Sequence, residues 1–294
     1  MSNFNRWSSW FPRSFAYARF REHHTEINEL YWSLAPAAGY TDYLARHAPA
    51  GTTPDALFHA TGPNARRISP SIDQWRLHFS KFQNWTRLST LVSAMSYFES
   101  YISTVATLAL RSDPLLRFGQ SRAVDGTSWL KANVPDDVSA RIVQLVKGTW
   151  PARLSAYRDL FGHAPPQLTN RLSELERMRQ LRNGVAHSFG RDPAYFEDPM
   201  VPAGEPVRLS ERRLLGWLSI IEECAEAVDD QLFRSHIGEF ELVWRYHRWK
   251  DEPREAIDKR YSTSAAFSRV LMRGFGSGPG RGFCKGLIAY YDAA

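Results

Sequence analysis

The sequence has few cysteines, few lysines and no long apolar run. Its 294 residues include 2 cysteines, Cys224 and Cys284, and no CxxC pair, which excludes a disulfide framework and a zinc knuckle. No apolar stretch approaches the roughly 20 residues that a membrane-spanning helix needs. Residues 1–10 do not have the pattern of a signal peptide. We therefore expect a cytoplasmic protein with reduced thiols and no membrane association.

Cations outnumber acids, and most of the cations are arginine. The 37 Lys plus Arg residues comprise 6 lysines and 31 arginines, and the formal net charge is +6. A GC-rich genome would explain this bias. Contact with phosphate would explain it equally well, because a guanidinium group binds phosphate through a planar fork of donors. Both interpretations stay open, and the positive charge permits a polyanionic partner.

The apolar pattern predicts a mainly α fold, and strand signals are scarce. Residues with helical spacing occupy 15–34, 72–110, 138–146, 151–161, 169–188, 211–233, 239–250 and 265–272. Segments rich in proline, glycine or polar residues, expected to be connections, are 36–70, 115–136, 191–209 and 274–282. Residues 287–291 have the pattern of a short strand.

The most informative string is Leu-Arg-Asn-Gly-Val-Ala-His at residues 181–187, near the end of an expected helix. On a helix Asn183 and His187 are neighbours on one face, and the long side chain of Arg182 can reach toward the same place. The string thus combines a permanent cation, an amide and an imidazole that titrates near neutrality. These groups suffice for RNA cleavage without a metal, in which a base activates a 2′-OH and a cation stabilises the phosphoryl charge.

The Arg-x4-His spacing alone is weakly specific, because chance predicts about one match in a chain of this composition. The chain contains three, at Arg19/His24, Arg158/His163 and Arg182/His187. The first lies in a charged stretch, which favours a solvated helix face. The second ends a short expected helix and is the alternative site. The third has the fuller RNxxAH form and is the preferred one.

This fuller form resembles the HEPN superfamily, whose hallmark is an arginine, a polar residue and a later histidine. The helix LVSAMSYFESYISTVATLAL at 91–110 looks like a helix common in RiboL-PSP-type and related HEPN families, and 207–233 looks like their closing helix. The resemblance covers residues 72–236, expected to be an HEPN-like helical bundle. Residues 1–71 are then an N-terminal helical extension with a connection, and 237–294 a C-terminal extension with a glycine-rich loop.

The resemblance implies a metal-independent endoribonuclease that acts as a homodimer, with no cofactor. Many relatives are toxins or anti-phage effectors, so an antitoxin or activator protein is a further expected partner besides RNA. Carried over by position, Arg182 binds the scissile phosphate, Asn183 orients the histidine or the substrate, and His187 is the general acid/base. Other relatives are inactive, so a silent RNA- or protein-binding module, or a scaffold without an RNA role, stays open.

Glu99 falls inside the apolar stripe of the helix expected over 72–110. A carboxylate there is costly unless it is paired or hydrogen-bonded. Arg182 and Arg179 on the helix expected over 169–188 are the candidate partners. The pair could support catalysis, or it could be a structural ion pair that fixes the bundle.

Aromatic and cationic residues alternate over 244–250, in the string Trp-Arg-Tyr-His-Arg-Trp-Lys. Trp244, Arg245, Arg248 and Trp249 could stack unpaired bases and contact phosphates. An amphipathic helix that packs both tryptophans on the bundle explains the string equally simply, and we prefer it. The pair His23-His24 has no further ligands at metal-binding spacing, so no metal site is expected.

Overall fold

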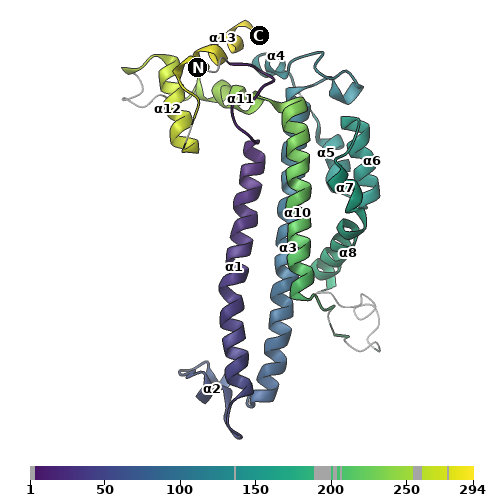
Figure 1. Cartoon of the computed structure of the whole chain (residues 1–294), viewed down its shortest axis with the longest axis vertical. Coiled ribbons are helices and arrows are strands. Elements are labelled where there is room, and N and C mark those ends of the chain that lie inside the picture. The colour runs from purple at the N-terminus through teal and green to yellow at the C-terminus, as the bar shows by residue number, and fades with distance from the viewer. Residues whose placement is uncertain are drawn as a thin grey trace. The chain divides into compact units, whose positions relative to one another are not determined.

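The computed structural model describes residues 4–135, 137–188, 200, 204, 205, 207–253, 260–276 and 278–294, without the side chains of residues 187, 188 and 275. This part of the chain is mainly helical and contains no strand, as the apolar spacing predicts (Figure 1). The longer helices are α1 (Phe15–Arg46), α3 (Ile72–Ser112), α8 (Leu172–Ser188) and α10 (Glu211–Leu232). The shorter helices are α2 (Pro54–Leu57), α4 (Gly126–Lys131), α5 (Ser139–Val146), α6 (Trp150–Phe161), α7 (Pro166–Asn170), α11 (Phe240–Trp249), α12 (Thr263–Phe275) and α13 (Arg281–Ala293).

Three segments differ from the expectation. Helix α1 continues through Pro36 to Arg46, so the connection is shorter than 36–70. A proline inside a helix costs roughly 3 kcal/mol, and the buried Ala38 and Ala45 show that packing continues beyond it. The expected loop at 115–136 contains α4, whose first turn is capped by Asp125 through a 2.8 Å bond from the Thr127 amide.

The expected strand at 287–291 is wrong, because these residues belong to α13. Leu287 and Tyr291 are four positions apart and both buried, so they occupy one face of a helix. An apolar run this short fits either a strand or one face of a helix, and the packing of Leu287 and Tyr291 decides here.

The chain divides into two compact units. Unit 1 consists of Met1–Arg19, Glu99–Leu172 and Glu223–Ala294, and unit 2 consists of Phe20–Phe98 and Ser173–Glu222. Each unit draws on more than one of the three ranges expected from the sequence. Helices α1, α3 and α10 contribute one part to each unit.

In unit 2 the segments of α1 and α3 run antiparallel, side by side (Figure 1). At one end His23 stacks on Tyr97 with ring centroids 4.6 Å apart, and at the other Arg76 lies 3.9 Å from Asp42. Segment 207–222 contacts both helices, since the Arg87 Nε of α3 donates to the Leu209 carbonyl at 2.6 Å and the Tyr31 hydroxyl of α1 donates to Glu211 at 2.7 Å. The core of this unit includes the fully buried Leu88, Leu91, Met95, Phe98, Leu175, Met178, Leu214 and Ile221.

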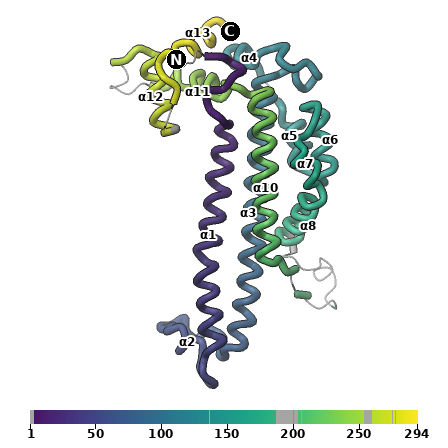
Figure 2. Tube along the Cα trace, viewed as in Figure 1, coloured from purple at the N-terminus to yellow at the C-terminus, as the bar shows by residue number. Residues whose placement is uncertain are grey.

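In unit 1 the C-terminal helices α11, α12 and α13 lie close together (Figure 2). Their buried side chains form an apolar cluster. Buried side chains from all three helices meet there, and Phe4, Phe11 and Phe15 of the N-terminal segment pack against it. The two helices α5 and α6 of this unit also pack on each other. No helix in the described residues is long and apolar enough to cross a membrane.

Candidate functional site

Helix α8 carries the RNxxAH string, so the structure confirms a helix at this position. Leu175 and Met178 in its first half are completely buried and anchor it in the core of unit 2. Arg182 and Asn183, one to two turns later, are half-buried. The motif therefore begins where the helix leaves the core and its polar side chains become partly accessible.

The side chains of Arg182 and Asn183 contact each other. The Arg182 Nη1 donates to the Asn183 Oδ1 at 3.1 Å. The amide nitrogen of Asn183 has no hydrogen-bond partner among the described residues. A guanidinium beside an amide offers several N–H donors to an anion. The backbone of His187 lies within α8, but its side chain is outside the described residues.

A neighbouring arginine on α8 is already neutralised. Arg179 makes a two-pronged contact with Glu176, with its Nε 3.0 Å and its Nη2 2.5 Å from the two carboxylate oxygens. This pair lies one turn before the motif, and it uses the charge of Arg179 locally. Arg182 contacts the amide of Asn183 through its Nη1.

Glu99 has an ion-pair partner other than the two arginines expected from the sequence. The Arg153 Nη1 donates to the Glu99 Oε1 at 2.9 Å, and both residues belong to unit 1. Arg153 is buried, donates through its Nε to the Gly148 carbonyl at 3.0 Å, and lies over the Trp150 ring. The expected need for a partner is met by an arginine of α6, and this contact supports the structural role of Glu99.

The alternative pair Arg158 and His163 is not brought together. The Arg158 Nη2 donates to the Thr169 Oγ1 at 3.3 Å. His163 follows Gly162, which has φ 78° and ends α6, and the His163 carbonyl accepts a bond from Gln231. Helix α6 ends between the two residues, so His163 does not continue the helical face of Arg158.

In the remaining Arg-x4-His pair, Arg19/His24, the histidine is buried. Its ring stacks on Phe20 at 5.5 Å, and its Nε2 lies 3.8 Å from a Glu222 oxygen. Burial lowers the pKa of His24, although Glu222 opposes this change. The expectation of a solvated face is therefore wrong for His24, because α1 turns this residue toward the core of unit 2.

The aromatic and cationic string of α11 divides between core and surface. Trp249 is buried in the cluster of α11, α12 and α13, with its ring 5.2 Å from Phe267. Arg245 forms a 2.7 Å ion pair with Glu252. Trp244 is half-buried with the Arg248 guanidinium 5.1 Å from its ring centroid, and it lines a shallow cavity of about 280 Å³ with Trp129. The packing interpretation holds for Trp249.

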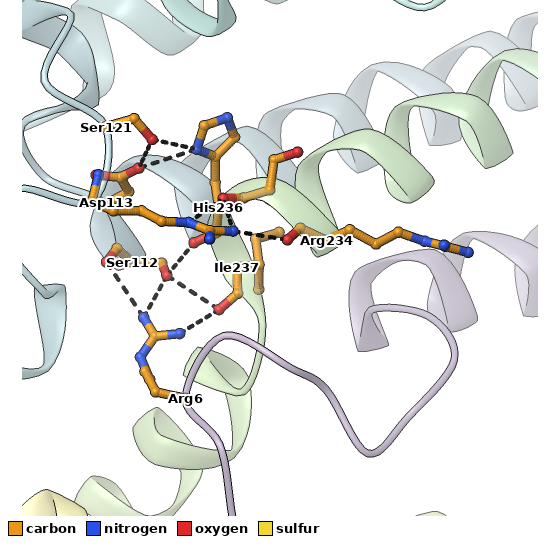
Figure 3. Close-up of polar contacts among 9 residues, drawn as sticks. Arg6, Ser112, Asp113, Ser121, Arg234, His236 and Ile237 are labelled. Carbon is orange, nitrogen blue, oxygen red and sulfur yellow. Dashed lines mark hydrogen bonds and ion pairs between the residues drawn. The ribbon is translucent and has the colours of Figure 1, made fainter.

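A polar cluster around Asp113 has no signal in the sequence, where the Ser-Asp-Pro string indicates only the end of a helix. Figure 3 shows Asp113, Ser121 and His236 converging. The Asp113 Oδ2 lies 3.1 Å from the His236 Nδ1 and accepts a 2.8 Å bond from Ser121, and its Oδ1 accepts one from the Arg122 amide. Burial favours a higher pKa for Asp113, but these hydrogen bonds outweigh it and lower the pKa.

The same cluster includes Arg6 and the π-helical turn η3 (Phe233–Ile237). Arg6 donates to the Ser112 Oγ and to the Ile237 carbonyl, each at 2.6 Å (Figure 3). Ser121 and Asp113 share the same nitrogen of His236, so the hydroxyl is not placed as a nucleophile opposite a general base. The cluster ties the N-terminal segment, the end of α3 and η3 together within unit 1.

Three buried carboxyl groups lie around residues 10–15, where the N-terminal segment leads into α1. They are Asp229, Glu239 and Glu241. The Glu241 Oε2 accepts a 2.9 Å bond from the Phe15 amide, and Asp229 accepts one of 3.2 Å from the Ser14 amide. Burial raises all three pKa values, to about 7 for Glu239 and to about 8 for Glu241. No group of three or more metal-ligating side chains occurs in the described residues.

In comparisons with known proteins, no family model, no curated protein and no solved structure matches this chain. Its function must therefore be inferred from its own residues.

Proposed function

We propose that this protein is a metal-independent endoribonuclease of the HEPN type that acts as a toxin or anti-phage effector. Arg182 holds the scissile phosphate, Asn183 orients the histidine or the substrate, and His187 transfers protons. The 2′-oxygen attacks the adjacent phosphorus after losing its proton, and the bond from phosphorus to the 5′-oxygen breaks. The products are a 2′,3′-cyclic phosphate and a 5′-hydroxyl, the leaving oxygen taking a proton from the acid.

One observation carries this proposal: among the three Arg-x4-His spacings, the one on α8 joins a partly accessible arginine to an amide. His24 is buried in unit 2, and Arg158 is directed to Thr169. Arg182 and Asn183 are instead in contact at the point where α8 leaves the core. A phosphate placed against them would meet donors from both side chains.

A homodimer completes the proposed mechanism. One imidazole cannot remove a proton from the 2′-oxygen and deliver another to the 5′-oxygen in the same step. A twofold axis would place the partner subunit's His187 across the same phosphate, so that one ring is the base and the other is the acid. An antitoxin or activator protein would control access to this site.

The test is incubation of the purified protein with total RNA in the presence of EDTA. The wild type is expected to cleave RNA and to leave 2′,3′-cyclic phosphate ends, whereas Arg182→Ala and His187→Ala are expected to be inactive. The matched control is the double variant Arg158→Ala/His163→Ala, which removes an equally spaced pair and should cleave like the wild type.

Two outcomes contradict the proposal. Full cleavage by His187→Ala would show that the motif is not the catalytic site. Equal RNA retention by the wild type and both single variants, without cleavage by any, would favour a silent RNA-binding module. Analytical ultracentrifugation of the wild type tests the dimer, and a purely monomeric species at the concentration used for cleavage would refute it.

A further inference from the structure

A row of aromatic rings follows α3 at its N-terminal end. We call it the aromatic ladder, and it consists of Phe58, Trp75, Phe79, Phe82 and Trp85. Successive ring centroids are 4.6, 4.6, 6.3 and 5.8 Å apart, and the last three pairs are stacked. The spacing of the four α3 residues, by three and four positions, places them along one side of the helix.

The ladder is accessible at its C-terminal end. Phe82 is 44% exposed and Trp85 is 43% exposed, whereas Trp75 and Phe79 are half-buried. Removing large aromatic side chains from water is energetically favourable, so adjacent exposed rings on a helix indicate a binding surface. A surface that offers flat ring faces suits ligands that are themselves flat.

Cations accompany the ladder. Between residues 58 and 88 the sequence contains five arginines and lysines, at Arg66, Arg67, Arg76, Lys81 and Arg87, against one acid, Asp73. Arg66 and Arg67 are exposed and form no ion pair with the described residues. The chain around the ladder therefore carries more cations than acids, and two of the cations, Arg76 and Lys81, lie close to Asp42 and Glu205 from other segments.

We propose that the aromatic ladder is a platform for single-stranded RNA, with bases stacked on Phe82 and Trp85 and phosphates held by the neighbouring cations. Interleaved rings and cations are what an unpaired strand requires, because every base has a face to stack and every nucleotide carries a charge. The ladder belongs to unit 2, as does Arg182. The choice of RNA as the polyanion rests on the proposed function.

A second copy of the chain fits this surface less well. In a twofold interface the same patch meets itself, so Arg76 and Lys81 would approach the same cations of the other copy. Such like-charge contacts are unfavourable. Lys81 is paired with Glu205 at 2.9 Å, but Arg76 lies 3.9 Å from its acid, Asp42, and Arg66 and Arg67 add unpaired charge. A polyanion relieves this charge, whereas a second copy increases it.

The experiment measures binding of a fluorescent 2′-O-methyl oligonucleotide of about 20 nucleotides by anisotropy. This probe lacks the 2′-hydroxyl and resists cleavage, so the full chain can be used. Phe82→Ala/Trp85→Ala is expected to weaken binding by roughly tenfold or more, since each stacked base contributes strongly. Trp32→Ala, which removes a 49% exposed tryptophan of α1 in the same unit, is the matched control and should change binding less than twofold.

Two further arms separate stacking from charge. An abasic strand of the same length keeps the phosphates and loses the bases, so it should bind the wild type at least roughly tenfold more weakly. The variant Arg66→Gln/Arg67→Gln should reduce the slope of log Kd against log salt concentration by about 0.7 for each phosphate that is no longer neutralised. Far-UV circular dichroism of each variant establishes that the helices persist.

Several results would overturn the inference. Phe82→Ala/Trp85→Ala could bind RNA as well as the wild type, or the abasic strand could bind as well as the intact one. The ladder variant could change the dimer mass without changing RNA binding. The protein could also bind anionic vesicles in preference to the oligonucleotide. If His187→Ala loses cleavage while the ladder variant cleaves and binds RNA like the wild type, this inference fails and the endoribonuclease proposal stands. Ladder-dependent binding without any cleavage by the wild type supports it while the endoribonuclease proposal fails.

Discussion

Ionisation of Glu241 is predicted to destabilise the protein progressively as the pH rises from about 4.5 to 8. Burial is the main reason that its pKa is raised to about 8, and the charges of Asp229 and Glu239 add to the effect. Since the pKa is higher in the folded state than in the unfolded chain, the folded state binds more protons between the two values. The stabilisation from the neutral acid is complete below about pH 4.5 and is lost as the pH rises through 8.

The size of the effect follows from the shift. Each pKa unit corresponds to about 1.4 kcal/mol, so a rise from 4.5 to about 8 amounts to about 5 kcal/mol once the group is fully ionised. The bond from the Phe15 amide favours the ionised form and is already included in this shift. For a chain of this size, a loss of about 5 kcal/mol lowers the Tm by roughly 10 °C, and the part of the loss that falls above pH 6.5 lowers it by roughly 4 °C.

The assay is thermal unfolding at pH 6.5, 7.5, 8.5 and 9.5 for the wild type and Glu241→Gln. Glutamine keeps an oxygen that can accept from the Phe15 amide, but it cannot ionise. At pH 6.5 the wild type has already lost part of this stability, and between pH 6.5 and 9.5 it should lose about a further 2 kcal/mol relative to the variant. The lowest pH in the series is 6.5 because burial lowers the pKa of His24, so its protonation would destabilise the fold at lower pH.

The control is Glu29→Gln, which removes an exposed glutamate of α1 and should reproduce the pH dependence of the wild type. If Glu241→Gln loses stability with pH as steeply as the wild type, Glu241 is not the group that ionises and the prediction is wrong. A steep slope that disappears only when Glu239 is also replaced would assign the effect to that neighbour.

Three further results are expected. Arg153→Ala should lower the free energy of unfolding by about 3 kcal/mol, and Glu99→Gln should lower it by about 1–2 kcal/mol. Denaturant titration of the double variant should show that the two effects are not additive, because both remove the same ion pair. Additive effects would contradict that pair. Cys224 and Cys284 should resist iodoacetamide in the native protein, because burial raises their pKa values to about 12 and about 11, and rapid labelling would show that they are accessible. Gly126→Ala should cost roughly 2 kcal/mol or more, since an added Cβ would lie 1.7 Å from a backbone carbonyl oxygen of α3, and an unchanged Tm would contradict this packing.

Apolar spacing predicts the long helices well where one face is buried over several turns. The expectation for 72–110 matches α3 to within two residues, and Ser210 caps α10 through a 3.3 Å bond from the Arg213 amide. Spacing fails at Pro36, where proline is normally expected to end a helix. Helix α1 continues to Arg46 because Ala38 and Ala45 are buried against residues distant in the sequence. Local patterns cannot reveal which helix will offer those residues.

The partner of Glu99 shows the same limit at the level of single side chains. The apolar stripe indicates that a carboxylate at this position needs a cation, and the structure contains one. The sequence does not indicate which of 31 arginines supplies it, because Arg153 is 54 residues away and sits in the first turn of α6. The Asp113 cluster is missed for the same reason, since His236 and Arg6 come from opposite ends of the chain.

Two strings of the sequence alternate rings with cations, and burial distinguishes them. In 244–250 the helix α11 is packed by α13 and α4, so the rings of Trp249 and Tyr246 are drawn into a core, whereas Trp244 stays half-buried. In 75–85 the rings of Phe82 and Trp85 stay exposed, because no described element covers them. The pattern of residues is alike in both, so only the packing around each helix determines whether its aromatic side chains stabilise the fold or are accessible to a ligand.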